Sequence, residues 1–183
     1  MINFRPLARS DLSTLQRWLN TPHVYEWWGR HSGPGSLGGA GADAATAAEM
    51  EAKYGATINH GGTTHRFIIE HDGAAIGLIQ WYHLRDYADY AREIGEDPAS
   101  AAGLDVLIGE ASAVGRGLGS KAIDAFVTSV IFKHADVDRV ITDPAATNAR
   151  SIRAFEKAGF THVRFATSDG KSFPEAILVR RRV

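Results

Sequence analysis

Apolar residues recur at the three- and four-residue spacing of an amphipathic helix in two segments of the chain. The first segment, residues 10–20, has Ser10 where an N-cap is expected. Its apolar positions are Leu12, Leu15, Trp18 and Leu19. The second segment begins after residue 117, and its apolar positions are Ile123, Phe126, Val127, Val130 and Ile131. A third, capped helix is predicted at 148–158, where Gly159 follows as a terminating residue.

Apolar and β-branched runs predict strands before, between and after these helices. The predicted strands lie at 3–7, 65–71, 74–84, 103–110 and 138–143, with two more within 161–181. The dipeptides Asp72-Gly73 and Asp169-Gly170 are typical of tight turns, so each predicts a hairpin. A hairpin-rich first part is thus followed by strand, loop, helix, strand, helix, strand and strand. This order predicts a mixed α/β fold.

Residues 31–64 differ from the rest of the chain in composition. They are rich in glycine and alanine, and they hold too few large apolar residues for a core of their own. An alanine-rich piece within them predicts one helix. We interpret the segment as an insertion or lid in a single domain spanning residues 1–183. For its glycine-rich part, 33–41, a loop and a dimer contact remain alternatives to a lid.

Length, charge and cysteine content narrow the class of protein. The chain has 183 residues, is 44% hydrophobic and carries a net charge of −1, which is ordinary for one globular domain without a nucleic-acid or membrane partner. The absence of cysteine excludes disulfides and thiolate nucleophiles. No apolar run has the length of a signal-peptide core or a membrane span. We therefore expect a soluble cytoplasmic protein, and the scattered histidines predict no metal site.

The segment ASAVGRGLGSKAI, residues 111–123, places three glycines between a predicted strand and a helix. Glycine lets consecutive backbone N–H groups converge, and the helix dipole adds partial positive charge, so this arrangement favours a pyrophosphate group. The spacing fits neither a P-loop nor the dinucleotide fingerprint, because Ser precedes Lys in GLGSK and the glycines run G-x-G-x-G. A plain glycine-rich turn is the alternative.

Two blocks give the chain a resemblance to a known superfamily. VGRGLGSKAI resembles the coenzyme A pyrophosphate loop of the GNAT acetyltransferases, [QR]-x-x-G-x-[GA], with Val114 departing from the first position. TNARSIRAFEKAGF resembles the next block of the same superfamily, N-x-x-[SA]-x-x-x-[YF]-E-K-x-G-F, in the right order. A finer resemblance, to aminoglycoside 6'-N-acetyltransferases, rests on segments along most of the chain: WLNTPHVYEWWG, IGLIQWY, GLDVLIGE, TDPAATNARSIRAFEKAGF and SDG. Siderophore acyltransferases share the tryptophan-rich first block.

The resemblance implies a GNAT fold, with a central, mostly antiparallel sheet, splayed central strands and flanking helices. It also implies acetyl-CoA as co-substrate, with backbone N–H groups of the central strand polarising the thioester carbonyl. The implied coenzyme contacts are Val106, Leu107, Ile108, Val114, Gly115, Arg116, Gly117, Leu118, Gly119, Ser120, Asn148, Ser151 and Phe155. Phe155 stands where many of these transferases have a tyrosine proposed to protonate the leaving thiolate.

The resemblance further implies an acidic site for a polycationic small molecule. Asp105 is its candidate catalytic residue, as general base or ammonium ligand. The candidate substrate-binding residues are Trp28, Tyr82, Asp89, Tyr90, Asp143 and Asp169. Between residues 86 and 105, six acidic residues stand against Arg92 alone, which agrees with binding of several ammonium groups. The structural alternatives are a solvated acidic face, turn positions for the aspartates and core packing for the tryptophan.

The expected function is acetylation of an aminoglycoside amine, most specifically the 6'-amine, conferring resistance. One alternative is an acyltransferase acting on a hydroxylysine-like siderophore precursor or a protein N-terminus. Another is a coenzyme A-binding module without catalysis. We expect a monomer or weak homodimer.

Overall fold

The structure is a computed structural model, and it describes residues 1–28, 46–55, 58, 62–167 and 173–183. The chain divides into two compact units. The first consists of Met1–Gln80 and Val106–Val114, and the second of Trp81–Asp105 and Gly115–Val183. Strands β3 (Ala74–His83) and β4 (Ala101–Ile108) each begin in one unit and end in the other.

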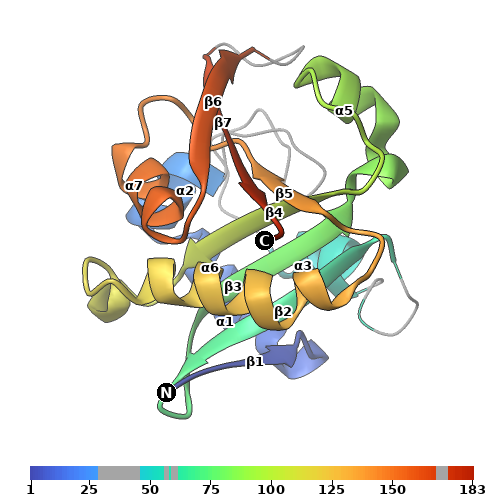
Figure 1. The fold of residues 1–183 in the computed structure, drawn as a ribbon. Coiled ribbons are helices and arrows are strands. Elements are labelled where there is room, and N and C mark those ends of the chain that lie inside the picture. The colour runs from blue at the N-terminus through green and yellow to red at the C-terminus, as the bar shows by residue number, and fades with distance from the viewer. Residues whose placement is uncertain (29–45, 56–57, 59–61, 168–172) are drawn as a thin grey trace. The chain divides into compact units, whose positions relative to one another are not determined.

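The first unit contains the strand order β1-β2-β3-β4, with β1 at Ile2–Pro6 and β2 at Thr64–His71. Strand β1 pairs antiparallel with β2 (Figure 1). The turn between β2 and β3 has Asp72 at φ 52° and Gly73 at φ 82°, the left-handed backbone of a two-residue hairpin turn. The predicted first hairpin is therefore confirmed. The helical elements of this unit are η1 (Arg9–Asp11), α1 (Leu12–Leu19), α2 (Pro22–Trp28), α3 (Ala47–Met50), η2 (Glu51–Gly55) and η4 (Ala111–Ala113).

Helix α1 buries the predicted apolar face. Leu15 and Trp18 are fully buried and Leu19 is nearly so, within the core of the first unit. The predicted N-cap at Ser10 is wrong, because the helix begins after the short turn η1 and its N-cap residue is Asp11. The Asp11 carboxylate accepts the Ala8 N–H at 2.9 Å and pairs with the Arg5 guanidinium, so a tertiary ion pair organises this helix start.

Part of the predicted insertion is packed into the first unit. Residues 47–55 are helical as expected, and the side chains of Met50 and Tyr54 lie in the core. Arg9 forms an ion pair with Glu51 and donates to the Gly55 carbonyl at 3.3 Å. Residues 31–45, 56–57 and 59–61 lie outside the described residues, so the lid and the single domain stay predictions.

The second unit contains the strand order β3-β4-β5-β7-β6. Strand β4 pairs parallel with β5 (Arg139–Thr142), whereas β7 (Glu175–Arg181) pairs antiparallel with β5 and with β6 (Thr161–Ala166). The predicted mixed α/β fold with a mostly antiparallel sheet is thereby confirmed. The turn residues Asp169 and Gly170 lie outside the described residues.

The helical elements of the second unit are η3 (Leu84–Tyr87), α5 (Ala88–Glu93), α6 (Leu118–Ser129), η5 (Ile131–Lys133) and α7 (Ala149–Lys157). Helix α6 buries Ile123, Phe126 and Val127 completely, as its periodicity predicts. The prediction that Val130 and Ile131 continue this helix is wrong, because α6 ends at Ser129 and Ile131 begins η5. Helix α7 lies beside β6 and β7 (Figure 1), and it is followed by Gly159 at φ 84°. In the described part of the chain, no helix is long and apolar enough to cross a bilayer.

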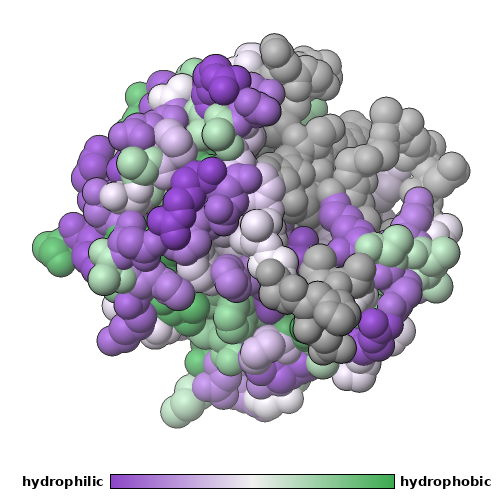
Figure 2. Space-filling model, turned by 90° about the vertical axis from the view of Figure 1, so that its right-hand side faces the viewer, coloured by the Kyte–Doolittle hydropathy of each residue, from purple (hydrophilic) through white to green (hydrophobic). Residues whose placement is uncertain are grey.

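Most of the described surface on the face shown in Figure 2 is hydrophilic. Large hydrophobic side chains exposed among the described residues are Met1, Val163, Phe165 and Val183.

Candidate active site

Two carboxylates of the second unit lie close to the same tyrosine. Asp105 lies within β4, and Asp143 directly follows the neighbouring parallel strand β5. The negative charges of both carboxylates act on the Tyr82 hydroxyl. Both are partly buried. Their roles toward a substrate stay predictions.

Tyrosines surround this pair of carboxylates. Tyr82 on β3 is 2% exposed, and its hydroxyl is hydrogen-bonded with that of Tyr90 on α5. Tyr90 in turn hydrogen-bonds Asp143. Burial raises the pKa of Tyr82 well above its usual value, and the negative charges of Asp105 and Asp143 raise it further. Burial and the charge of Asp143 likewise raise the pKa of Tyr90. Both phenols therefore remain protonated at neutral pH, so the Tyr90 O–H donates a hydrogen bond to the Asp143 carboxylate.

The Tyr82 ring packs directly against the backbone of Gly103, which only a residue without a side chain permits. A Cβ atom built at Gly103 would lie 2.3 Å from Cε2 and Cζ of Tyr82, far inside van der Waals contact. Tyr87 packs edge-on against the same ring, with 4.9 Å between ring centroids. Sequence reasoning did not select Gly103 or Tyr87 as site residues. The available signal was a glycine in the interior of an apolar strand, which often marks a close approach.

The predicted coenzyme loop has the backbone expected of an anion site. Gly115 and Gly117 have φ angles of 79° and 74°, in the left-handed region that favours glycine. Both are exposed, and nothing lies within 4 Å of a Cβ atom built at either. Gly117 is the N-cap residue of the twelve-residue helix α6. Arg116 is exposed between the two glycines, and the Ser120 hydroxyl donates to the Gly117 carbonyl at 3.0 Å.

The other predicted coenzyme contacts of the second unit have structural roles in α7. The Asn148 side chain accepts the Ser151 N–H at 3.1 Å and so caps the helix. Phe155 is 2% exposed and packs edge-on against Phe160, with 5.2 Å between ring centroids. Its ring belongs to the core, so the coenzyme contact expected of Phe155 stays a prediction.

Val106, Leu107, Ile108, Val114 and Trp28 belong to the first unit. There, a Cβ atom at Gly77 would lie 2.2 Å from the Leu107 carbonyl oxygen, so glycine permits this close approach of β3 to β4. His23 Nε2 lies 3.0 Å from the Ile108 carbonyl oxygen. Trp28 is partly buried, and its indole N–H is buried without a hydrogen-bond partner among the described residues. Its contact with a substrate stays a prediction.

The remaining acidic residues divide into three cases. Asp89 on α5 is largely exposed and forms an ion pair with Arg92 at 3.0 Å. Asp169 lies outside the described residues. Glu96, by contrast, is mostly buried against arginines of β5 and β6. The acidic residues between 86 and 105 therefore differ in environment: some are exposed to solvent, whereas Glu96 is neutralised by arginines.

A second group of polar side chains has ligand types suited to a transition metal. Ligand atoms of His83, His134 and Asp136 lie within 4.8 Å of one another. Burial lowers the pKa of His83, which favours the neutral imidazole. However, Arg85 already neutralises Asp136 through an ion pair at 2.8 Å. The absence of a metal cofactor stays a prediction.

Comparison with known proteins identifies relatives over nearly the whole chain. The model of the acetyltransferase (GNAT) domain matches residues 8–167. The aminoglycoside N(6')-acetyltransferase type 1 of Klebsiella pneumoniae is 32% identical over 182 residues, covering 99% of this chain and 83% of the relative. The kanamycin resistance protein of Rhizobium radiobacter is 38% identical over 81 residues, covering 44% of this chain and 71% of the relative.

Solved structures agree with this match. The crystal structure of aminoglycoside acetyltransferase AAC(6')-Ib in complex with coenzyme A has a TM-score of 0.77 at 28% identity, covering 100% of this chain and 95% of that one. The complex of the same enzyme with coenzyme A and kanamycin has the same score, identity and coverage.

Proposed function

Because the chain belongs to the GNAT acetyltransferase family, we propose that it transfers the acetyl group of acetyl-CoA to an aminoglycoside, at the 6'-amine. The observation that carries this substrate class is the pair of carboxylates Asp105 and Asp143, whose charges both act on the buried, protonated tyrosines Tyr82 and Tyr90. Such a pair attracts and orients a polycation. The similarity to aminoglycoside N(6')-acetyltransferase type 1 supports the 6' position.

The acetyl donor binds at the exposed loop before α6. Left-handed Gly115 and Gly117 let backbone N–H groups converge at the start of the helix, where the dipole is positive. The coenzyme pyrophosphate is the anion that this loop holds, with Arg116 and Ser120 beside it. Val114, Leu118, Gly119, Asn148 and Ser151 complete the proposed contacts.

Transfer proceeds directly, without a covalent enzyme intermediate. The amine nitrogen attacks the thioester carbonyl carbon, the C–N bond forms, and the C–S bond breaks to release the coenzyme thiolate. Asp105 receives the proton that the amine loses, and solvent protonates the thiolate. Holding the two substrates in line supplies about 7–11 kcal/mol of the barrier reduction. Backbone N–H groups of Val106–Ile108 polarise the carbonyl as an oxyanion hole.

The amine substrate is held by carboxylates and aromatic groups. Asp143 binds a second ammonium group, oriented by the hydrogen bond from Tyr90. Tyr82 is buried, so it acts by positioning Tyr90 rather than by touching the sugar. Trp28, Asp89 and Asp169 are the further proposed contacts. Phe155 offers no proton, which is why the thiolate relies on solvent.

The physiological role that follows is resistance to aminoglycosides. We propose a cytoplasmic location, because acetyl-CoA is an intracellular metabolite, and a monomer or weak homodimer as the active form.

Thiol release from acetyl-CoA, measured over a panel of amines, tests the function. An aminoglycoside is expected to release thiol much faster than hydroxylysine or peptides. Faster release with hydroxylysine or with a peptide would instead indicate the siderophore or N-terminal alternative. Calorimetric titration with coenzyme A completes the test: binding without thiol release from any amine would indicate a non-catalytic module.

A further inference from the structure

Helix α5, which carries Tyr90, is too short to be stable by itself. It has six residues, Ala88–Glu93, whereas isolated helices shorter than about 12 residues are marginal in water. Among its residues only Ala91 is fully buried, and Ile94 adds one buried side chain just past its end. Contacts from outside the helix must therefore hold Tyr90 against Asp143.

The end of α5 has the hydrogen bonds of a Schellman motif. The Glu96 N–H donates to the Ala91 carbonyl at 2.8 Å, and the Gly95 N–H donates to the Arg92 carbonyl at 3.1 Å. Gly95 has a φ of 67°, as this motif requires. The motif directs the carbonyls of Ile94 and Gly95 away from the helix.

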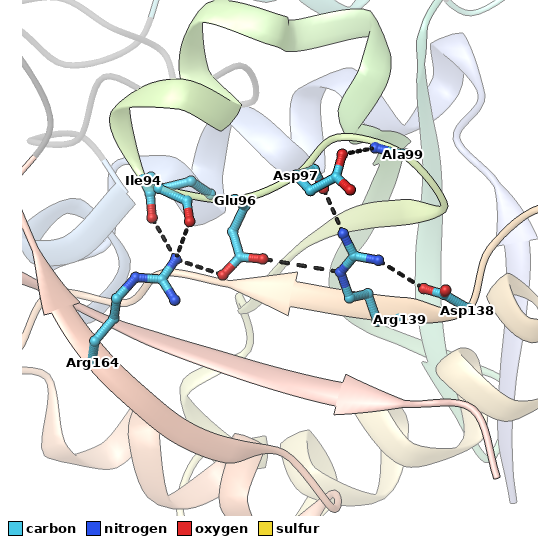
Figure 3. A network of polar contacts seen from close by, with 8 residues as sticks. Ile94, Glu96, Asp97, Ala99, Asp138, Arg139 and Arg164 are labelled. Carbon is cyan, nitrogen blue, oxygen red and sulfur yellow. Dashed lines mark hydrogen bonds and ion pairs between the residues drawn. The ribbon is translucent and has the colours of Figure 1, made fainter.

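Arg164, from strand β6, binds these outward carbonyls (Figure 3). Its Nη2 donates to the Ile94 carbonyl at 2.6 Å and to the Gly95 carbonyl at 3.1 Å. The same nitrogen donates to the Glu96 carboxylate. One guanidinium thus joins the end of α5 to a strand that lies about seventy residues further along the chain.

A second arginine completes the network. Arg139, at the start of β5, donates to the Asp97 carbonyl at 2.6 Å and to the Asp138 carboxylate at 2.9 Å (Figure 3). Its Nε lies 4.0 Å from Glu96. The side chains of Glu96 and Arg139 are only 12% and 11% exposed and that of Arg164 is 36% exposed, so the Glu96 carboxylate lies between two arginines in a partly buried place.

We propose that Arg164, Glu96 and Arg139 form a clamp that positions Tyr90 and thereby determines affinity for the amine substrate. The clamp joins the segment after α5 to β5, the strand that Asp143 directly follows, and to β6. With α5 held, the Tyr90 hydroxyl stays on Asp143 and the carboxylate keeps one orientation. These are positioning residues, since none of them is expected to touch substrate or the reacting atoms. The kinetic part of this proposal rests on the function proposed above.

The proposal is tested by measuring KM separately for the aminoglycoside and for acetyl-CoA. Arg164→Met removes three hydrogen bonds from the clamp, so KM for the aminoglycoside is expected to rise about tenfold, a size typical of coupling through intermediate residues. KM for acetyl-CoA is expected to stay within about twofold, because the clamp does not contact the loop before α6. In a Tyr90→Phe background the same substitution should add little, since the hydroxyl on which it acts is already absent.

Arg180→Met is the matched control. Arg180 also joins a backbone carbonyl and a carboxylate, those of Ala158 and Asp124, but it does so at α7 and α6. It is expected to lower thermal stability without a selective rise in KM for the aminoglycoside. A selective rise in this control would show that general destabilisation is the cause and would overturn the clamp.

Hydrogen exchange of the substrate-free protein tests the clamp independently of activity. Amides of residues 88–96 are expected to exchange about tenfold faster in Arg164→Met and unchanged in Arg180→Met. Unchanged exchange in Arg164→Met, or unchanged KM for the aminoglycoside, would overturn the proposal. If the wild-type protein acetylates no aminoglycoside, the proposed function fails, and the exchange rates alone decide whether the clamp holds α5.

Discussion

Replacing Gly103 with alanine tests how tightly the candidate active site is built. The added Cβ would lie 2.3 Å from Cε2 and Cζ of Tyr82 and 2.6 Å from its hydroxyl oxygen. Carbon atoms in contact are about 3.5–4.0 Å apart, so the ring would have to move by more than about 1 Å. It has little room to do so, because Tyr82 is 2% exposed and packs against Tyr87. The movement would disturb the hydrogen bond between its hydroxyl and that of Tyr90.

The expected cost follows from overpacking of a buried ring. Such substitutions destabilise by about 1–3 kcal/mol. For a protein of this length, each kcal/mol corresponds to a Tm decrease of about 2–4 °C. We also expect KM for the aminoglycoside to rise, since the Tyr82–Tyr90 hydrogen bond supports the orientation of Asp143.

Urea denaturation and steady-state kinetics measure the two effects. Tyr82→Val provides the control background, because without the ring the new methyl group meets no atom of Tyr82. Gly103→Ala should cost less than about 0.5 kcal/mol there, a coupling that a double-mutant cycle reports. The reasoning is refuted if Gly103→Ala is as stable as the wild type, or if its cost is the same in both backgrounds.

Three further outcomes are expected. Asp105→Asn should lower turnover more than about a hundredfold, because it removes the proposed proton acceptor. Phe155→Tyr should change turnover less than about tenfold. Steady-state rates in the reverse order would contradict these roles. Hydrogen bonds from Arg5 lower the pKa of Asp11 below its ordinary value of 3.8. The stabilisation that the ionised Asp11 carboxylate contributes is therefore present above pH 3.8, and it is lost as the pH falls through the lowered pKa. Asp11→Asn should therefore reduce the loss of unfolding free energy between pH 7 and pH 3, and an unchanged loss would contradict this. Gly117→Ala, at φ 74°, should cost about 1 kcal/mol and raise KM for acetyl-CoA severalfold. Gly73→Ala, at φ 82°, should cost the same without changing that KM.

The elements with strong local patterns could be predicted from the sequence. The apolar faces of α1 and α6 and the Asp72-Gly73 hairpin follow from spacing and turn chemistry within a few residues, and the structure contains all three. The start of α1 was predicted incorrectly at Ser10. There the decisive contact, between Arg5 and Asp11, depends on how the chain folds back on itself rather than on the local pattern.

The parts of the candidate site that belong to recognisable sequence motifs could be predicted. Asp105 lies within one predicted strand and Asp143 ends another, and the structure makes these two strands parallel neighbours. The role of Glu96 was not predictable, because its partner Arg164 is 68 residues away and a run of acidic residues does not reveal which members are neutralised. Composition indicated an acidic surface, whereas the fold assigns Glu96 to an internal ion pair.

The most direct test of the central claim compares two aminoglycosides that differ only at the 6' position. One carries an amine there and the other a hydroxyl, and both are incubated with the protein and acetyl-CoA while thiol release is followed. The account predicts rapid release with the amine, a product bearing one acetyl group at that nitrogen, and no release above background with the hydroxyl compound. Equal release from both compounds, or from neither, would contradict it.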